Sequence, residues 1–560
     1  MMSPTRWMAW LFAAALASVP MHAPAHEPNG LPRHEHAEGT TGPTREAVGV
    51  VFHDRDGDRG RDEGEEGLEG VRVSNGRQVV KTDKEGRYTL AVDDDAILFV
   101  IKPRGWMTPV GADKLPHFYY IHKPGGSPAS KFPGVAPTGP LPGSVDFPLR
   151  PQEEPEQFRA LLFGDTQPRD LKEVEYIAHD VVEQVVGEKA HGASLGVTLG
   201  DIAFNDLSVM KPLNKTIALI GIPWYNVLGN HDLNFESLDD KHSDETFEGI
   251  YGPSYYAFDH GPVHFLVLDD VTWVGPKKEG EKGAFHGGLG PVQMEFIRND
   301  LASIPREQLV VLMMHIPLVD VEDRQELYRL IEMRPFALSI SAHTHNQQHR
   351  FITREDGWMG REPHHHVINV TVCGSWFGGA PDENGIPHAT MSDGAPNGYS
   401  IFTFDGHKYD IQYRAARRPA AHQMNIAAPE TVATADSGET AVLVNVFGGS
   451  ERSKTEMRLG EEGSWVTMER VAVEDPYFMA MKRDEEGPNP PRGRKLPKPF
   501  KATHIWRATL PPNPAPGTYL IQVRTTDMFG KTYTDRRSIR ILGPGDRDQA
   551  LDGVGKSSAP

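Results

Sequence analysis

The 560-residue sequence has a single cysteine and no excess of basic residues. Because Cys373 has no second cysteine to pair with, a disulfide within the chain is excluded. The alternating apolar pattern of residues 367–373 predicts that this thiol lies in the core. The net charge of −19 argues against a general nucleic-acid-binding face, which would be basic.

A long apolar run is also missing. The longest one, residues 7–19, is shorter than the roughly 20 apolar residues that a membrane-spanning helix needs. Arg6 precedes this run and Ala23-Pro24-Ala25 follows it, so residues 1–25 are predicted to be a signal peptide. No cysteine lies near the cleavage site, which excludes lipidation there. We therefore expect a periplasmic or secreted protein without a transmembrane segment after signal removal.

The remaining length is sufficient for about three or four domains. Residues 26–45 are polar and are expected to form a linker. Short strands and turns over residues 46–152 predict an N-terminal β-sandwich domain. Residues 153–418 alternate strands and helices as in a layered α/β fold. Short strands return over residues 419–543 and predict a C-terminal β-sandwich domain, followed by a disordered tail at 544–560.

Two helices and a strand pair are predicted within residues 153–418. Apolar residues at helical spacing predict a helix over Asp170 to Gly187, and Pro291 is expected to open a helix that ends at Ala302. The stretches 251–258 and 263–268 read as paired strands across a turn.

Polar residues follow five apolar runs of this central region. Each run predicts a buried strand, and α/β proteins build their sites at the carboxyl edge of the sheet. Carboxylates, amides and imidazoles are all metal-ligating groups. One such run is weak evidence, but five of them in order indicate a shared metal site. The polar residues are Asp165, Gln167, Asp201, Asn230, His231, Asp232, His315, His343 and His345.

These five blocks resemble those of the calcineurin-like metallophosphoesterase superfamily over about residues 155–418. The resemblance implies a multidomain protein with a central α/β two-sheet sandwich flanked by two β-sandwich domains, as in one subgroup. It also implies two divalent metal ions, either Mn, Zn or Fe. The first ion would be held by Asp165, Gln167, Asp201 and His345, and the second by Asp201, Asn230, His315 and His343.

Two such ions could bind a phosphoryl group and generate a hydroxide nucleophile from water. His231 would stabilise the transition state or protonate the leaving oxygen, with Asp232 as its orienting partner. The expected function is therefore hydrolysis of a phosphoester by an exported dimetal phosphodiesterase or phosphatase. The choice between a monoester and a diester substrate stays open, because the residues of the five blocks do not distinguish these two substrate classes.

Three positions differ from patterns found in the superfamily. Gln167 stands where His or Gly is usual, and its amide oxygen, a weaker and harder donor than imidazole, could favour Mn²⁺. A nucleotidase is less expected, since such enzymes generally carry His at this position. Ala342 replaces a glycine of the last block. Phe204 stands where purple acid phosphatases have a tyrosine, so a tyrosinate-ligated Fe(III) is not expected.

A different class of function remains open. The chain could be a surface glycan-binding or adhesion protein that keeps a phosphoesterase core as a scaffold, with a cell-surface polymer as its partner. A scaffold without catalytic demand would be expected to lose ligands. Since all five blocks retain metal-ligating residues, the sequence favours an enzyme over a scaffold.

Residues 54–65 are dense in carboxylates around glycines and could bind Ca²⁺. The alternative is a solvated acidic hairpin, which the interspersed Arg55, Arg59 and Arg61 could neutralise without a metal. The spacing is not that of an EF-hand loop.

Two further groups follow the last block. His364-His365-His366 are expected to form the polar beginning of a strand rather than a metal site. Trp376, Phe377 and Tyr399 lie in turn-rich stretches and could stack on an organic leaving group, although loop aromatics often pack down as lids.

Overall fold

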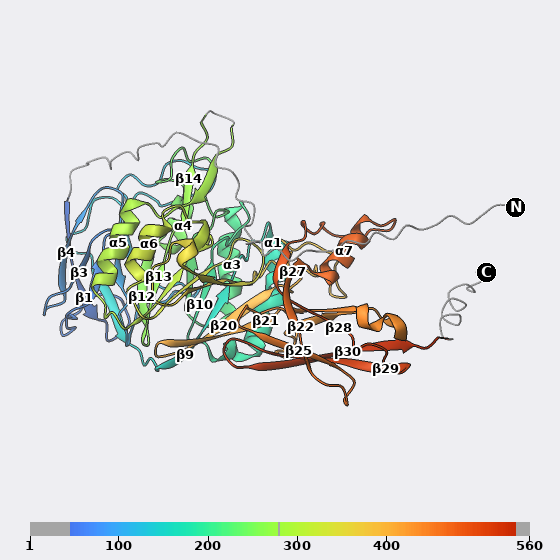
Figure 1. Ribbon diagram of the computed structural model, residues 1–560. Helices are drawn as coiled ribbons and strands as arrows, with labels where there is room; N and C mark the ends of the chain where they lie inside the picture. Colours follow the sequence, from blue (N-terminus) through green and yellow to red (C-terminus); the bar gives the residue numbers. More distant parts are fainter. Residues whose placement is uncertain (1–44, 278–280, 545–560) are drawn as a thin grey trace. The chain divides into compact units, whose positions relative to one another are not determined.

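The computed structural model describes residues 45–277 and 281–544 of the chain (Figure 1). The predicted signal peptide, nearly all of the predicted linker and the tail after residue 544 lie outside these ranges, so those predictions stay predictions. Within the described ranges, no helix is long and apolar enough to cross a membrane.

A five-stranded sheet forms one half of the central region. Its first three strands in spatial order run parallel, β20 is antiparallel to β9, and β21 is antiparallel to β20. In spatial order the strands are β11 (Trp224–Val227), β10 (Leu195–Leu199), β9 (Gln157–Phe163), β20 (Gly398–Asp405) and β21 (Lys408–Ala415).

A six-stranded sheet forms the other half. Its four middle strands run parallel and its two outer strands are antiparallel to their neighbours. The order is β12 (Tyr256–His260), β13 (Val263–Val267), β16 (Leu309–Met313), β17 (Ala337–Ser341), β19 (His364–Ile368) and β18 (Gln348–Ile352). A separate hairpin consists of β14 (Val271–Val274) and β15 (Ala284–Gly287).

Side-chain alternation sets how the two sheets pack. Along β9, Ala160 and Leu162 belong to the apolar cluster that also contains the six-stranded sheet, whereas Leu161 and Phe163 belong to a second cluster with helices. The period-2 geometry of a strand thus buries both faces, which explains why the parallel strands are continuous apolar runs. The predicted α/β architecture with two central sheets is confirmed.

Helices cover the outer faces of both sheets. The first cluster continues into α5 (Gly290–Ala302) and α6 (Arg324–Ile331). The second contains α1 (Leu171–Ile177), α2 (Glu183–Gly187) and α3 (Met210–Ile217). The helix predicted over 170–187 is confirmed, with a π-helical turn (Ala178–Val182) between α1 and α2. The predicted strand at 251–258 is wrong in its first half, because α4 (Glu245–Tyr251) ends there and β12 begins only at Tyr256.

Two four-stranded sheets precede the central region. One has the order β4 (Arg87–Val92), β1 (Arg45–His53), β8 (Phe147–Pro151), β6 (Trp106–Met107), and the other β3 (Val79–Lys81), β2 (Arg72–Ser74), β5 (Ala96–Ile101), β7 (Tyr119–His122). Their buried residues, among them Val51 and Val73, join the same apolar cluster as the central sheets. The N-terminal sheets are therefore part of a continuous core.

Two more sheets follow the central region. Their strands are β22 (Met424–Ala427), β24 (Ala441–Val446), β28 (Lys501–Thr509) and β27 (Glu469–Glu474) in one, and β23 (Thr431–Ala433), β30 (Thr532–Leu542), β29 (Gly517–Thr526), β25 (Lys454–Leu459) and β26 (Val466–Thr467) in the other. Val444, Trp506 and Val523 share one apolar cluster between them. The helix α7 (Pro476–Glu486), which the sequence analysis did not predict, lies between β27 and β28 in the chain.

Candidate metal centre

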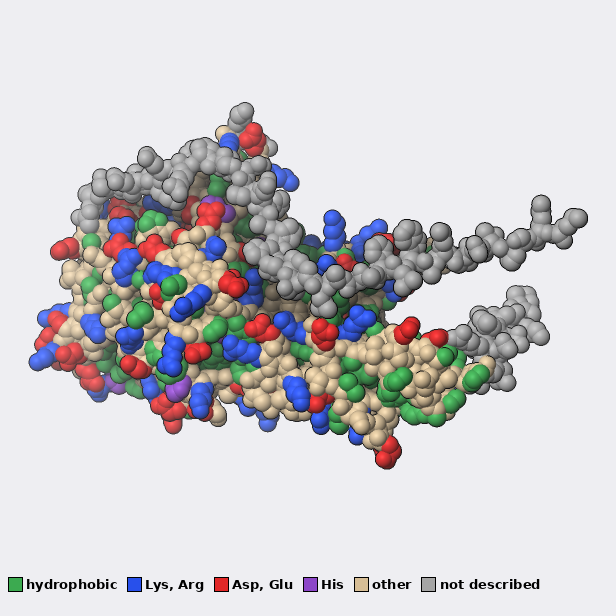
Figure 2. Space-filling model, in the orientation of Figure 1, with side chains coloured by type: hydrophobic (Ala, Val, Ile, Leu, Met, Phe, Trp, Pro, Cys, Tyr) green, Lys and Arg blue, Asp and Glu red, His purple; other side chains and the backbone are tan. Residues whose placement is uncertain are grey.

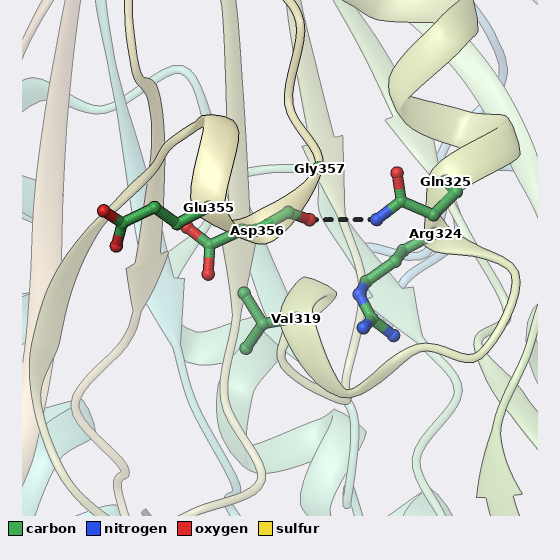
Figure 3. A pocket seen from close by; sticks show the side chains of 6 residues that line it. All are labelled: Val319, Arg324, Gln325, Glu355, Asp356 and Gly357. Carbon is green, nitrogen blue, oxygen red and sulfur yellow. Dashed lines mark hydrogen bonds between the residues drawn. The ribbon is translucent and has the colours of Figure 1, made fainter. Parts of the chain in front are cut away.

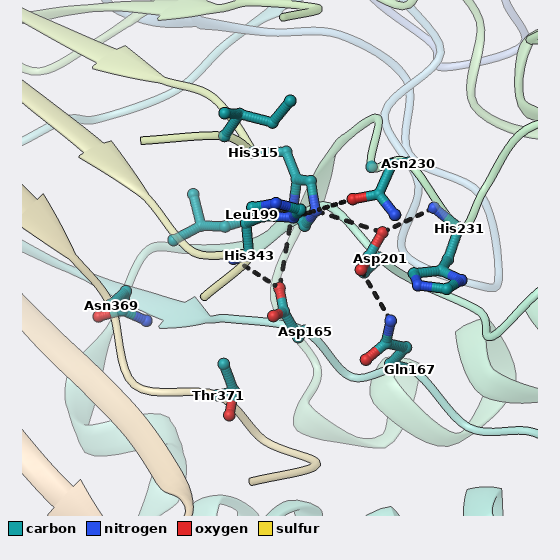
Figure 4. Close-up of polar contacts among 12 residues, drawn as sticks. Asp165, Gln167, Leu199, Asp201, Asn230, His231, His315, His343, Asn369 and Thr371 are labelled. Carbon is teal, nitrogen blue, oxygen red and sulfur yellow. Dashed lines mark hydrogen bonds and ion pairs between the residues drawn. The ribbon is translucent and has the colours of Figure 1, made fainter. Parts of the chain in front are cut away.

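The predicted ligands come from the carboxyl ends of five parallel strands. Asp165 and Gln167 follow β9, Asp201 follows β10 and Asn230 follows β11. From the other sheet, His315 follows β16, and His343 and His345 follow β17. Figure 4 shows six of these side chains converging from separate strands on one cluster.

Asp201 lies at the centre of this cluster. Its Oδ1 accepts the backbone N–H of His231 at 2.8 Å and lies 3.3 Å from His315 Nε2. Its Oδ2 accepts from the Gln167 amide nitrogen at 2.7 Å. Both carboxylate oxygens are therefore directed at predicted ligands, as a residue shared between two ions requires.

His315 joins the remaining residues to Asp201. Its Nε2 lies 3.1 Å from both Asn230 Oδ1 and His343 Nδ1, while its Nδ1 lies 2.9 Å from the Leu199 carbonyl oxygen. The carbonyl fixes the proton on Nδ1 and leaves Nε2 directed at the cluster. The backbone N–H of His315 also donates to Asp270, a buried carboxylate that the sequence analysis missed.

On the other side of the cluster, Asp165 meets His345. His345 Nε2 lies 3.1 Å from Asp165 Oδ2, and its Nδ1 lies against the Gly374 carbonyl oxygen. The backbone N–H of His343 donates to Asp165 Oδ1 at 3.2 Å. All seven predicted ligands are thus brought together. The amide oxygen of Gln167, however, faces Cys373 Sγ at 3.7 Å. The amide group must flip, so that its oxygen and nitrogen change places, before the oxygen can face the cluster as the predicted metal ligand.

The backbone at the cluster adopts conformations that side-chain-bearing residues rarely take. Five of the predicted ligands have positive φ: Asp165 (26°), Gln167 (42°), Asp201 (49°), His343 (69°) and His345 (51°). Each such residue costs of the order of 1 kcal/mol or more, and strain of this kind gathers at functional sites. The turns after the strands therefore hold the ligand side chains at a cost in stability.

Burial sets the charge of the cluster. Burial lowers the pKa of His315, but the Asp201 carboxylate outweighs it and raises the pKa to about 10. Burial raises the pKa of Asp201, yet His315 lowers it more and holds it below its usual range. Burial lowers the pKa of His343 to about 3 and that of His345 to about 4, so both imidazoles are neutral and available as ligands.

The cluster fits divalent cations. Ligand atoms of Asp201, His315 and His343 all lie within 4.8 Å of one another. Asp165 Oδ2 is buried without a hydrogen-bond donor, and burial raises the pKa of this carboxyl to about 7. An added positive charge would relieve both features. Oxygen and imidazole donors without a thiolate suit Mn, Zn or Fe.

His231 borders the cluster without being enclosed by it. Its ring stacks on Phe204 with centroids 4.6 Å apart, and its Nδ1 lies 2.5 Å from Asn205 Oδ1. The prediction that Asp232 orients this imidazole is wrong. The Asp232 carboxylate instead accepts the backbone N–H groups of Ile202, Ala203 and Gly229, which shapes the turn beneath the site.

Three family models match successive parts of the chain. The N-terminal part of the calcineurin-like phosphoesterases matches residues 56–134, the phosphoesterase itself residues 158–347, and the C-terminal part residues 366–533. The chain belongs to the calcineurin-like phosphoesterases. It has the N- and C-terminal regions of the predicted subgroup, and the family supports a metal-dependent phosphoesterase.

Solved structures resemble this phosphoesterase only distantly. A dimetal phosphatase from Danio rerio is 14% identical with a TM-score of 0.33, and the match covers 46% of this chain and 96% of that one. A purple acid phosphatase from yellow lupin (Lupinus luteus) seeds is 13% identical with a TM-score of 0.34, covering 62% and 66% respectively. No curated protein matches the chain.

Side chains that are only half-buried mark the open side of the phosphoesterase site. They include His231, His343, Phe204 and Trp376, whose ring lies 4.0 Å from that of His345. Trp376 therefore remains a candidate for substrate contact. Phe377 and Tyr399 do not, because both are buried, and the Tyr399 hydroxyl pairs with His191.

The three consecutive histidines stand apart from the metal centre of the phosphoesterase. They form the first residues of β19, as expected, but all three are buried rather than exposed. Ser339 Oγ lies 2.8 Å from both His364 and His366, and His365 lies between His349 and Tyr409. Burial lowers the pKa of each imidazole, so the group is neutral core structure.

The loop over residues 54–65 brings carboxylates together as expected. Asp54, Asp56 and Glu65 form one group of candidate ligands, and Asp56, Asp58 and Asp62 form another. Several of these carboxylates already accept backbone N–H groups, as Asp54 does from Gly57 and Glu65 from Arg55. Calcium binding at this loop stays a prediction.

A hollow of about 400 Å³ lies elsewhere on the phosphoesterase region (Figure 3). It is lined by Val319, Arg324, Gln325, Glu355, Asp356 and Gly357. Gln325 donates to the Asp356 carbonyl oxygen across it. The hollow shares no residue with the metal centre.

Proposed function

We propose that the chain is an exported dimetal phosphoesterase that hydrolyses a phosphomonoester or phosphodiester. The proposal is carried by one observation: side chains from five separate strand ends, far apart in the sequence, meet around the buried carboxylate of Asp201. Family membership supports the reaction class.

The proposed ligand sets are those of the family resemblance. Asp165, Gln167, Asp201 and His345 would hold one ion, and Asp201, Asn230, His315 and His343 the other. When bound, two divalent ions supply Lewis acidity and lower the pKa of water. Asp165 is enclosed whereas His343 is only half-buried, so a substrate would approach the cluster from the side of His343.

His231 is proposed to hold or deliver a proton at the leaving oxygen. Asn205 accepts from Nδ1–H, which leaves Nε2 free to exchange a proton. The neighbouring Phe204 ring fixes the plane of the imidazole. Asp232 contributes to the site through the backbone that it holds and not as a proton carrier.

Export and the flanking regions are part of the proposal. Residues 1–25 would direct the chain to the periplasm or the exterior. The sheet pairs on either side of the central region are proposed to be β-sandwich domains, and two paired sheets around one apolar cluster support this for residues 424–542.

Hydrolysis of bis-p-nitrophenyl phosphate and p-nitrophenyl phosphate tests the proposal. The mature protein is stripped with a chelator, and Mn²⁺, Zn²⁺ or Fe²⁺ is then restored separately. Metal-dependent release of nitrophenolate is expected, and the ratio of the two rates reports diester or monoester preference. Folded protein that binds fewer than about two metals per chain and hydrolyses neither compound would contradict the proposal and favour a scaffold.

A further inference from the structure

One stretch of this acidic chain contains no acidic residue. Residues 487–526 carry arginines and lysines but neither Asp nor Glu, although the whole chain has 77 acidic residues. The basic side chains concentrate just after α7, where the exposed ones are Arg492, Arg494, Lys495, Lys498 and Lys501. In Figure 2, a few Lys and Arg side chains are visible in this part of the molecule.

This basic segment is fastened to a loop of the metal centre. The backbone N–H of Gly379 donates to the Arg494 carbonyl oxygen at 2.7 Å, and the buried Leu496 packs near Gly379. The same loop carries Trp376, whose ring lies 4.0 Å from His345. The C-terminal region therefore brings cationic side chains close to the catalytic cluster.

A second cation reaches the same place from the first ligand block. The Arg169 guanidinium lies 4.3 Å from the centre of the Phe204 ring, which stacks on His231, and it donates to the Trp376 carbonyl oxygen at 2.8 Å. The Phe204 ring thus lies between the Arg169 guanidinium and His231, the proposed proton carrier.

Both arginines converge on a single carboxylate oxygen. Glu173 Oε1 pairs with Arg494 and lies 3.4 Å from Arg169 Nη1. The Glu173 side chain is 3% exposed, whereas those of Arg169 and Arg494 are 26% and 48% exposed. One carboxylate neutralises only one guanidinium. Among these three residues one positive charge is therefore unbalanced, and both guanidinium groups are partly exposed to solvent.

We propose that Arg169 and Arg494 form a subsite for a second anionic group of the substrate, so that the preferred substrate is a phosphoester carrying a further phosphate. Guanidinium groups bind phosphate oxygens through charge-assisted, bidentate hydrogen bonds. The proposal rests on the proposed phosphoesterase function and narrows its substrate class. Arg492, Lys495 and Lys498 would continue the cationic surface along a longer polyanion.

A matched pair of substrates tests the subsite. Thymidine 5′-(p-nitrophenyl phosphate) and its 3′-phosphorylated derivative share the scissile diester and the leaving group and differ only in one added phosphate. We expect the wild type to favour the bisphosphate in kcat/KM, mainly through KM. Arg494→Gln should lower this preference about tenfold, and Arg494→Lys should retain most of it.

Arg494 is the position to vary, because Arg169 lies two residues from a proposed ligand. Arg361→Gln is the matched control, since Arg361 is 96% exposed and pairs only loosely with its neighbour Glu362. The preference should also weaken in the wild type when the ionic strength rises from about 0.05 to 0.3 M, and weaken less in Arg494→Gln.

The outcomes separate the two proposals. Hydrolysis of both substrates with an equal preference in wild type and Arg494→Gln would overturn the subsite and leave the phosphoesterase intact. Hydrolysis of neither of these substrates, and of neither nitrophenyl phosphate used above, by metal-loaded protein would overturn the proposed function itself. Equal losses in Arg494→Gln and Arg494→Lys, with unchanged preference, would show that Arg494 only fastens the C-terminal segment, which also overturns the subsite.

Discussion

Asn205 lies against His231, with Oδ1 2.5 Å from the imidazole Nδ1. The neighbour in sequence, Asp232, directs its carboxylate to three backbone N–H groups instead. Asn205 reaches the imidazole because its backbone is left-handed (φ 63°) and its own N–H donates to the His231 carbonyl oxygen. The orientation of the proposed proton carrier thus depends on an amide rather than on an acid.

His231→Ala should keep both metals and slow the chemical step. Loss of a positioned proton donor typically costs about 10²- to 10⁴-fold in kcat. Metal content by plasma mass spectrometry and kcat for bis-p-nitrophenyl phosphate give the two readings. An unchanged kcat would remove His231 from the mechanism.

Asn205→Ala should have a smaller effect in the same direction, about tenfold in kcat with the metals retained, because the imidazole loses its orienting acceptor. In the double variant with His231→Ala, the loss at Asn205 should disappear, since the two residues act as a unit. Additive losses would mean that Asn205 acts independently of His231.

Asp201→Ala, Asn230→Ala and His343→Ala should each lose activity through loss of metal. Asp201→Ala should lower the content of both ions, because this carboxylate is the proposed bridge. His179→Ala is the control, since this imidazole is 58% exposed and pairs with Glu183 on the surface. Normal metal content in Asp201→Ala would contradict the proposed bridge.

Gly229→Ala should damage the metal centre without adding a charge. A Cβ at Gly229 would lie 2.0 Å from the Asp201 backbone nitrogen and 2.5 Å from its Oδ1, so the two turns must separate. We expect lower metal affinity and at least a tenfold loss of activity. Gly187→Ala, where no atom lies within 4 Å of the added Cβ, should behave as wild type in the same metal titration.

A buried ionic cluster joins the N-terminal sheets to the central region. Arg72 lies 2.6 Å from Asp259 and 2.9 Å from Asp300, and His264 bridges the same two carboxylates at 2.7 and 2.6 Å. Arg72→Met should cost about 3 kcal/mol, because two buried carboxylates each lose one of their two cationic partners and keep only His264. Arg77→Met, which removes an exposed pair with Glu295, should cost less than about 1 kcal/mol.

The same ionic cluster predicts that the stability of the folded protein depends on pH. Burial lowers the pKa of His264, but Asp300 and Asp259 outweigh it, and the pKa in the folded protein is raised. The stabilisation is therefore complete below the unfolded pKa of about 6.5 and is lost as the pH rises through the higher folded value. The Tm difference between wild type and His264→Gln should shrink between pH 6 and pH 9. A difference that grows with pH would contradict a protonated His264.

The sequence by itself determined the central α/β region and the residues that meet at the candidate metal centre. Apolar runs such as Leu309–Met313 predict strands buried on both faces, and a polar residue directly after such a run is then expected at the edge of the sheet. This local logic requires no knowledge of distant contacts. It located all seven side chains that the structure brings together.

Only the tertiary structure decided what surrounds those residues. Asn205 and Arg169 follow no strand-end pattern, whereas Asp270 follows the apolar run 263–268 but belongs to none of the five blocks. All three reach the site because turns from different strands meet there. The sequence pattern did not distinguish the buried Phe377 from the half-buried Trp376, although they are neighbours. Arg494 lies 321 residues from Glu173 and meets it only when the C-terminal sheets pack on the central region. The charges beside the metal centre therefore depend on packing between distant parts of the chain, which the periodicity of the local sequence does not predict.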